Sequence, residues 1–209
     1  MTIDEKYMRR CIQLARNGIC HAAPNPMVGA VIVRDRKIIG EGYHVRCGEG
    51  HAEVNAIASV KDESLLKDAT IYVSLEPCSH YGKTPPCADL IIRKGIPRVV
   101  VGCVDPFSLV AGRGIQKLRD TGIEVTVGVL EKECRELIRA FVTFNLKKRP
   151  YITLKWAQSA DGFLDIRRED GNAVRLSTPL STLAVHKMRA EQKAILVGPV
   201  SYTHLRAHE

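Results

Sequence analysis

Apolar residues recur along the first 148 residues with two different periods. In the segment EKYMRRCIQLARN (5–17) they fall close to helical spacing, and Gly18 follows as a stop, which predicts a first helix. Within 28–44, two β-rich runs flank Asp35 and Arg36, as the strands of a hairpin flank their turn. Helical and strand-like segments then alternate. The sequence predicts further helices at 51–60, 88–95, 114–122 and 131–148, and strands at 70–77, 97–104 and 123–130.

Strands that alternate with helices after an opening hairpin predict an α/β sandwich, with a mixed sheet and helices on both faces. The pattern breaks at the run Lys-Lys-Arg-Pro that ends at Pro150, so we expect a first domain over 1–147 and a second domain that begins at 150. The second domain is predicted to run to 198 and to be incomplete. Its predicted elements are a strand at 151–157, a helix at 178–191 and a strand at 194–198. Residues 199–209 fit neither period and are expected to be a non-native tail.

Composition and charge narrow the possible partners. The 31 Lys and Arg outnumber the 23 Asp and Glu, and the resulting +8 favours nucleic acid, an acidic surface or a phosphorylated small molecule. No apolar run approaches the ~20 residues that span a bilayer, and MTIDEKYMRR lacks the apolar stretch of a secretory signal. We therefore expect a cytoplasmic protein that does not insert into membranes. Its seven cysteines are best read as metal ligands or core residues before disulfides.

Three short motifs carry candidate metal ligands. His51 stands at the start of a predicted helix, Cys78 follows a predicted strand, and Cys87 lies where the next helix begins. One imidazole and two thiolates suit Zn²⁺, and three protein ligands leave the fourth tetrahedral position for water, as in catalytic zinc sites. Zinc lowers the pKa of such a water from 15.7 toward ~7. The pattern therefore predicts a zinc hydrolase.

Glu53 supplies the acid–base group that this chemistry needs. It lies two positions beyond His51, about 200° around a helix, so its carboxylate can sit beside the metal without binding it and can shuttle protons. A His-x-Glu motif followed by Pro-Cys-x-x-Cys is the known signature of zinc deaminases. Here eight residues, SHYGKTPP, separate Cys78 from Cys87. That longer loop carries His80 and Lys83, which predicts a different mode of substrate recognition.

Two non-catalytic interpretations remain open at this point. The histidine and the two thiols could be ordinary core residues, or the zinc could be structural, with Cys47, His44 or His80 as a fourth ligand. The net charge of +8 also suits a nucleic-acid-binding module with structural zinc. Only 5% of the residues are aromatic, however, which argues against the stacking platform expected of single-strand binders.

Four ordered stretches, NPMVGAVIV, HAEVNAI, LEPCSHYGKTPPC and LVAGRGI, closely resemble the deaminase motifs of the RibD-type family of bifunctional riboflavin-biosynthesis proteins. In that family a pyrimidine deaminase precedes a reductase, and the resemblance covers about 5–147. It implies a cytidine-deaminase-like α/β/α sandwich in which Glu53 is the proton donor and acceptor. It also implies zinc ligands His51, Cys78 and Cys87, and substrate-binding residues Asn25, His44, His80 and Lys83.

The substrate implied by this resemblance is 2,5-diamino-6-(5-phosphoribosylamino)pyrimidin-4-one, whose 2-amino group is hydrolysed to release ammonia. Asn25, held between two prolines, could present a donor and an acceptor to a pyrimidine edge, and Lys83 and the histidines could bind a ribose phosphate. Where the family has Asp-Pro-Asn before LVAG, this chain has Phe107, which removes an asparagine's hydrogen bonds to the sugar. A tRNA or nucleoside deaminase is the alternative enzyme, and the long loop between the cysteines argues against it.

Beyond residue 150, the stretches YITLKWAQSADGF and VHKMRAEQKAILVG resemble the opening of the family's reductase domain. That domain has a dihydrofolate-reductase-like fold and uses NADPH to reduce ribosyl to ribityl. Because NADPH is expected to bind only an intact reductase domain, we predict no reductase activity for these 209 residues. The family commonly associates through reductase domains, so a homo-oligomer is possible. The residues at matching reductase positions are Lys155, Ser159, Asp161 and Arg189, whereas Phe163 replaces the usual Lys or Arg.

Overall fold

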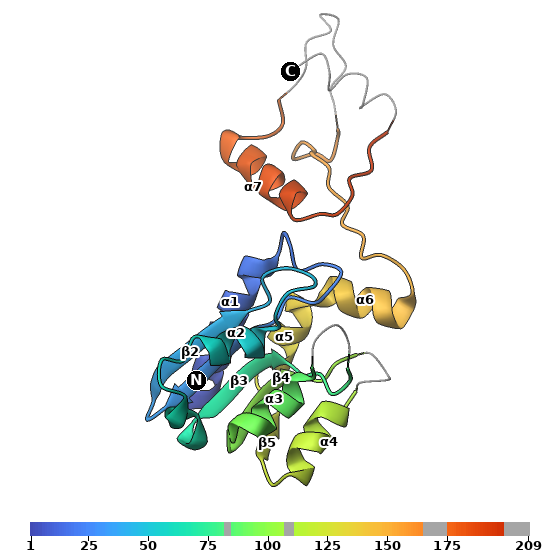
Figure 1. Cartoon of the computed structure of the whole chain (residues 1–209). Helices are drawn as coiled ribbons and strands as arrows, with labels where there is room; N and C mark the ends of the chain where they lie inside the picture. The colour runs from blue at the N-terminus through green and yellow to red at the C-terminus, as the bar shows by residue number, and fades with distance from the viewer. Residues whose placement is uncertain (82–84, 107–110, 165–174, 199–209) are drawn as a thin grey trace, which may run out of the picture. The chain divides into compact units, whose positions relative to one another are not determined.

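The computed structural model of the chain describes residues 1–81, 85–106, 111–164 and 175–198 (Figure 1). It divides into two units, Met1–Tyr151 and Ile152–Glu209. Lys83, Phe107 and the predicted tail 199–209 lie outside the described residues, so the expectations about them stay predictions. Among the described residues, no helix is both long enough and apolar enough to cross a membrane.

A five-stranded mixed sheet forms the centre of the first unit, with the strand order β2-β1-β3-β4-β5. β1 pairs antiparallel with β2 and β3, whereas β3, β4 and β5 are parallel. Asp35 and Arg36 form the hairpin turn with positive φ angles of 50° and 60°, the geometry that matches the twist of the flanking strands. The strands are β1 (Gly29–Arg34), β2 (Lys37–Tyr43), β3 (Thr70–Leu75), β4 (Arg98–Cys103) and β5 (Glu124–Val127).

Helices cover both faces of this sheet, as the sequence predicts. Successive strand residues face opposite sides: Ile32 packs with α2, α3 and α4 in one core, and Val31 packs with α1 and α5 in the other. Figure 1 shows the three-layer arrangement that results. The helices are α1 (Ile3–Ala15), α2 (Ala52–Ala58), α3 (Cys87–Lys94), α4 (Arg113–Asp120), α5 (Glu131–Leu137) and α6 (Arg139–Lys147), with short 3₁₀ turns at Arg16–Gly18 and Glu63–Asp68.

Glycines in β2 place α2 directly on the sheet. A Cβ atom at Gly42 would lie 2.3 Å from the backbone nitrogen of Ala56, and one at Gly40 would lie 2.6 Å from the Ala56 carbonyl oxygen. Such distances are impossible for a side chain, so only glycine allows this approach. The close packing fixes the first turn of α2, which follows His51 and carries Glu53.

Two predictions from the apolar pattern are wrong. The helix expected over 131–148 is two helices, because Ile138 leaves helical geometry (φ −106°, ψ 20°) while its side chain stays buried in the α1–α5 core. In the second unit, 151–157 and 194–198 form no strand, and Trp156 and Leu196 are exposed. A strand exists only through hydrogen bonds to a neighbouring strand, which apolar composition cannot supply. The predicted helix does form, as α7 (Pro179–Ala190), capped by the Thr178 side chain.

Candidate metal centre

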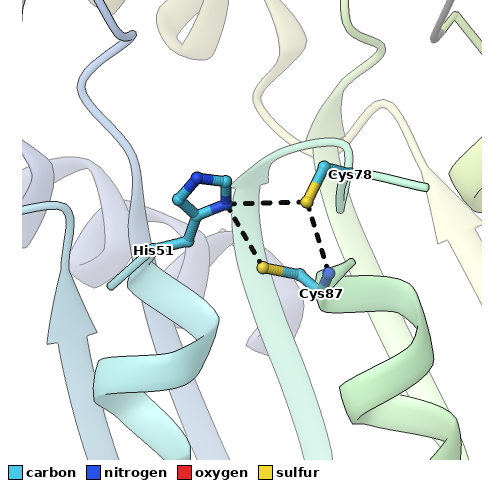
Figure 2. Close-up of side chains that lie close together, drawn as sticks. All are labelled: His51, Cys78 and Cys87. Atoms are coloured by element: carbon cyan, nitrogen blue, oxygen red, sulfur yellow. Dashed lines mark hydrogen bonds between the residues drawn. The ribbon is translucent and has the colours of Figure 1, made fainter. Parts of the chain in front are cut away.

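Three sequence-distant side chains meet at one point of the first unit. His51 is the N-cap of α2, Cys78 follows the end of β3 by three residues, and Cys87 is the first residue of α3. The His51 Nδ1 atom lies 3.3 Å from Cys87 Sγ and 3.5 Å from Cys78 Sγ (Figure 2). All three ligand atoms lie within 4.8 Å of one another. The structure therefore brings together the three residues that the sequence predicts as ligands.

These distances fit a tetrahedral zinc ion. Bonds of ~2.1 Å to nitrogen and ~2.3 Å to sulfur at tetrahedral angles separate a nitrogen and a sulfur ligand by about 3.6 Å. The observed separations of 3.3 and 3.5 Å need only a small adjustment to reach that value. His51 would bind through Nδ1, which is the ring nitrogen that faces both sulfur atoms (Figure 2).

The first turn of α3 stabilises negative charge on Cys78. The backbone N–H of Cys87 donates to Cys78 Sγ at 3.3 Å, and the N–H of Ala88 donates to the Cys78 carbonyl oxygen at 3.1 Å. Donation from the Cys87 thiol and from His51 lowers the pKa of Cys78, and the pKa of Cys87 rises correspondingly because it keeps its proton. A thiolate is the form that binds metal, so the local backbone prepares Cys78 for that role.

No fourth protein ligand joins this group in the part of the chain that the structure describes. Cys47 and His80 are exposed. His44 is buried, and its two ring nitrogens lie at hydrogen-bond distance from Asn25 and Gly50 instead. The described residues thus favour an open, catalytic type of zinc site over the structural type, whose four protein ligands close the coordination sphere.

Glu53 lies in the first turn of α2, is only 3% exposed and lines the cavity next to the three ligands. Burial raises the pKa of Glu53 to about 7. A carboxyl group with this pKa can both accept and release a proton at neutral pH. The predicted 200° separation of His51 and Glu53 around a helix is wrong, because His51 precedes the helix and has extended backbone angles (φ −70°, ψ 168°). Glu53 nevertheless lies outside the ligand group.

A cavity of about 300 Å³ opens beside the metal centre, at the lower end of the usual size range of ligand sites. Of the predicted substrate residues, Asn25, His44 and His80 line it, and Lys83 lies outside the described residues. Phe141 and Asn145 also line the cavity, and sequence reasoning missed both, because helical periodicity in α6 does not tell which side faces a ligand. Glu76 and Asp105, at the ends of β3 and β4, also line the cavity.

Glu76 is a buried carboxylate that the sequence motifs do not single out, although it directly precedes Pro77 and Cys78. Its Oε1 accepts the backbone N–H groups of Gly114 and Ile115, at 2.9 and 3.3 Å. Its Oε2 accepts those of Gly112, at 2.9 Å, and Asp105, at 3.2 Å. The side chain therefore joins the β3 end, which carries a metal ligand, to the segment that follows β4. A charged residue inside LEPC, directly after a buried strand, is the signal that could have found it.

Glu76→Gln is expected to lower the free energy of unfolding by about 3 kcal/mol. Glutamine keeps one oxygen but turns an NH₂ group toward two backbone N–H donors, and buried hydrogen bonds to a charged group contribute roughly 1.5–3 kcal/mol each. Urea denaturation followed by circular dichroism measures the loss. Glu63→Gln is the matched control, because Glu63 is exposed and pairs with Lys94 at the surface, and should change stability by less than ~1 kcal/mol. If the two variants were equally stable, the assigned structural role of Glu76 would be wrong.

In the second unit, Ser159 and Asp161 are brought together in one turn, where the Ser159 hydroxyl donates to the Asp161 carboxylate. The backbone N–H of Ser159 donates to the Phe163 carbonyl oxygen at 2.8 Å and closes the same turn. Lys155, Asp161 and Arg189 are exposed. No contact in this unit tests their assignment to a reductase site, so it stays a prediction.

Comparison with known families agrees with both units. Residues 1–103 match the cytidine and deoxycytidylate deaminase zinc-binding region, and residues 150–206 match the RibD C-terminal domain. The first match contains His51, Cys78 and Cys87, so the zinc site has the support of both the family and the geometry. The second match indicates that the start of a reductase domain follows the first unit.

Among curated proteins, the chain is 48% identical over 196 residues to the riboflavin biosynthesis protein RibD of Aquifex aeolicus, covering 94% of this chain and 54% of that protein. It is 44% identical over 195 residues to RibD of Escherichia coli, covering 93% and 52%. A solved structure from Thermotoga maritima, a diaminohydroxyphosphoribosylaminopyrimidine deaminase/5-amino-6-(5-phosphoribosylamino)uracil reductase, is 46% identical with a TM-score of 0.81, covering 90% and 53%. The chain thus spans about half the length of the curated relatives it matches.

Proposed function

The chain belongs to the RibD family of riboflavin-biosynthesis proteins, and from this premise we propose that its first unit is a zinc-dependent hydrolytic deaminase of an aminopyrimidine. One observation carries the proposal. A His-Cys-Cys group with the spacing of zinc ligands lies close to a buried, non-ligating carboxylate, and His51, Cys78 and that carboxylate line one cavity. This combination suits hydrolysis better than a purely structural metal.

Within the proposed site, His51, Cys78 and Cys87 would hold Zn²⁺, which supplies hydroxide at neutral pH when it is bound. Glu53 takes up the two protons of the attacking water one after the other on a carboxylate oxygen. It delivers the first to the pyrimidine ring nitrogen and the second to the departing amine, which leaves as ammonia. Its pKa of about 7 suits a group that must both accept and release a proton in each cycle.

We propose 2,5-diamino-6-(5-phosphoribosylamino)pyrimidin-4-one as the substrate. Water replaces its 2-amino group, giving ammonia and the corresponding aminouracil. The proposal follows the family and the name of the Thermotoga maritima relative, and it is supported by Asn25 and His80 on the wall of the cavity. In the sequence, His80 and Lys83 stand between the two cysteines, and a donor and a cation would suit a phosphate.

An ammonia-release assay tests this proposal against its rivals. The zinc-loaded chain should release ammonia from the phosphoribosylaminopyrimidine and not from a tRNA anticodon stem-loop or from cytidine. Release from the tRNA alone would favour the alternative enzyme. No release from any of the three, with one zinc ion bound per chain, would favour a structural site.

For the second unit we propose a contribution to an NADPH-dependent reductase site, through Lys155, Ser159, Asp161 and Arg189, within the longer domain that the relatives carry. The 209 residues alone should not oxidise NADPH. We further propose a cytoplasmic location, which suits the free buried thiols of Cys11, Cys103 and Cys134. We also propose that the protein forms homo-oligomers and does not bind nucleic acid.

A further inference from the structure

His44 and Asn25 form a hydrogen-bonded chain on the wall of the cavity. Asn25 Nδ2 lies 3.1 Å from His44 Nε2, and His44 Nδ1 lies 3.1 Å from the carbonyl oxygen of Gly50. Both residues line the cavity, but His44 is only 2% exposed. Each ring nitrogen therefore already has a protein partner, which leaves His44 little capacity to bind substrate directly.

The Gly50 carbonyl determines the direction of every bond in this chain. A carbonyl oxygen only accepts, so His44 Nδ1 must carry the proton and donate it. The Asn25 atom that faces Nε2 is the amide nitrogen Nδ2, which only donates, so Nε2 carries no proton and is left as the acceptor. Asn25 must then turn its NH₂ group toward His44, and its Oδ1 atom points away from the ring.

The acceptor that starts the chain is itself fixed by α2. Asn55 Nδ2 donates to the Gly50 carbonyl oxygen at 3.2 Å and to the Tyr43 carbonyl oxygen at 2.8 Å. The backbone N–H of His44 donates to the Val28 carbonyl oxygen at 2.9 Å, which holds the histidine at the end of β2. The helix that carries Glu53 thus also holds the loop that orients His44.

We propose that His44 is a positioning residue for Asn25: held by the hydrogen bond that it donates to the Gly50 carbonyl, it directs the Asn25 carbonyl oxygen into the cavity as the acceptor for an N–H group of the aminopyrimidine. Among the described residues, no donor is bonded to that oxygen. The assignment rests on the proposed deaminase function for the identity of the ligand, but the bond directions do not. It changes the expected role of His44 from substrate contact to orientation of a neighbour.

A double-mutant cycle tests the proposal on the full chain. Asn25→Ala and His44→Phe should each lower kcat/KM for the phosphoribosylaminopyrimidine by about tenfold, mainly through KM. The double variant should lose about tenfold as well, and not ~100-fold, because His44 acts through Asn25. His44→Gln can keep an acceptor for Asn25 and should stay within about threefold of the original chain. His186→Phe, an exposed histidine in the second unit, is the matched control.

Zinc content should be unchanged in all these variants. Losses that multiply to ~100-fold in the double variant, or a His44→Gln variant as impaired as His44→Phe, would overturn the positioning role. A second measurement needs no turnover. Long-range ¹H–¹⁵N NMR of the labelled chain should show His44 protonated at Nδ1 and bare at Nε2, and the opposite tautomer would overturn the proposal. If the original chain releases no ammonia, the proposed substrate fails, while the NMR result still decides the orientation of Asn25.

Discussion

Glu53→Gln is expected to lower the rate of ammonia release by about 10²- to 10⁴-fold, while the protein keeps its zinc. General acid–base catalysis contributes an effect of this size. Glutamine has nearly the same shape as glutamate, but its amide can neither take up a proton from water nor deliver one to the leaving amine. Because Glu53 lies outside the group of three ligand atoms, its replacement should leave the metal bound.

Zinc per chain and steady-state ammonia production, measured on the same preparation, separate the two roles that Glu53 could have. Glu63→Gln, at an exposed glutamate that is not part of the cavity lining, should match the original chain in both. A Glu53→Gln protein that turns over normally would exclude its acid–base role. One that has lost its zinc would show instead that the carboxylate serves to hold the metal.

The architecture of the first unit could be predicted because its signals are local. Alternating periods locate the strands and helices, and Asp35-Arg36 marks the hairpin turn that the structure confirms. The break at Ile138 escaped prediction for a different reason. Its apolar side chain satisfies the helical pattern while its backbone turns to keep it buried, so the sequence pattern is the same for one helix or two.

The metal ligands could be predicted because they stand in recognisable sequence motifs. His51, Cys78 and Cys87 stand in short stretches whose residue types reveal their chemistry, and the structure brings them together. Glu76 and Asn145 carry no such mark. Glu76 acts through backbone N–H groups some 30 to 40 residues away, and backbone groups are the same in every sequence. Long-range hydrogen bonds of this kind come only from the three-dimensional arrangement.

The link between Asn25 and His44 lies between these cases. Resemblance places both residues near the substrate, which suggests two parallel contacts with the ligand. The structure connects them in series, from the Gly50 carbonyl through the ring to the amide. A residue that is expected to contact substrate can therefore act by orienting its neighbour instead. The position of a group that only accepts hydrogen bonds, here the Gly50 carbonyl, distinguishes these two roles.

Cys87→Ser is expected to abolish both zinc binding and ammonia release. Changes to groups that merely orient metal ligands already cost ~10- to 100-fold in affinity, and removal of a thiolate ligand should cost more. Cys87 is fully buried at the start of α3, so no nearby solvent-exposed group can take its place. Purified Cys87→Ser protein should hold close to no zinc where the original chain holds about one ion.

The same variant separates loss of metal from loss of fold. Bound zinc at 1,000 times its dissociation constant stabilises a folded chain by about 4 kcal/mol, so a chelator should lower the Tm of the original protein. Cys87→Ser should start near that lower Tm and should not respond to the chelator. Cys47→Ser, at the exposed cysteine considered as a fourth ligand, should keep zinc, turnover and the chelator response. If Cys47→Ser instead lost its zinc, four protein ligands would close the site, and no position would remain for the water that hydrolysis requires.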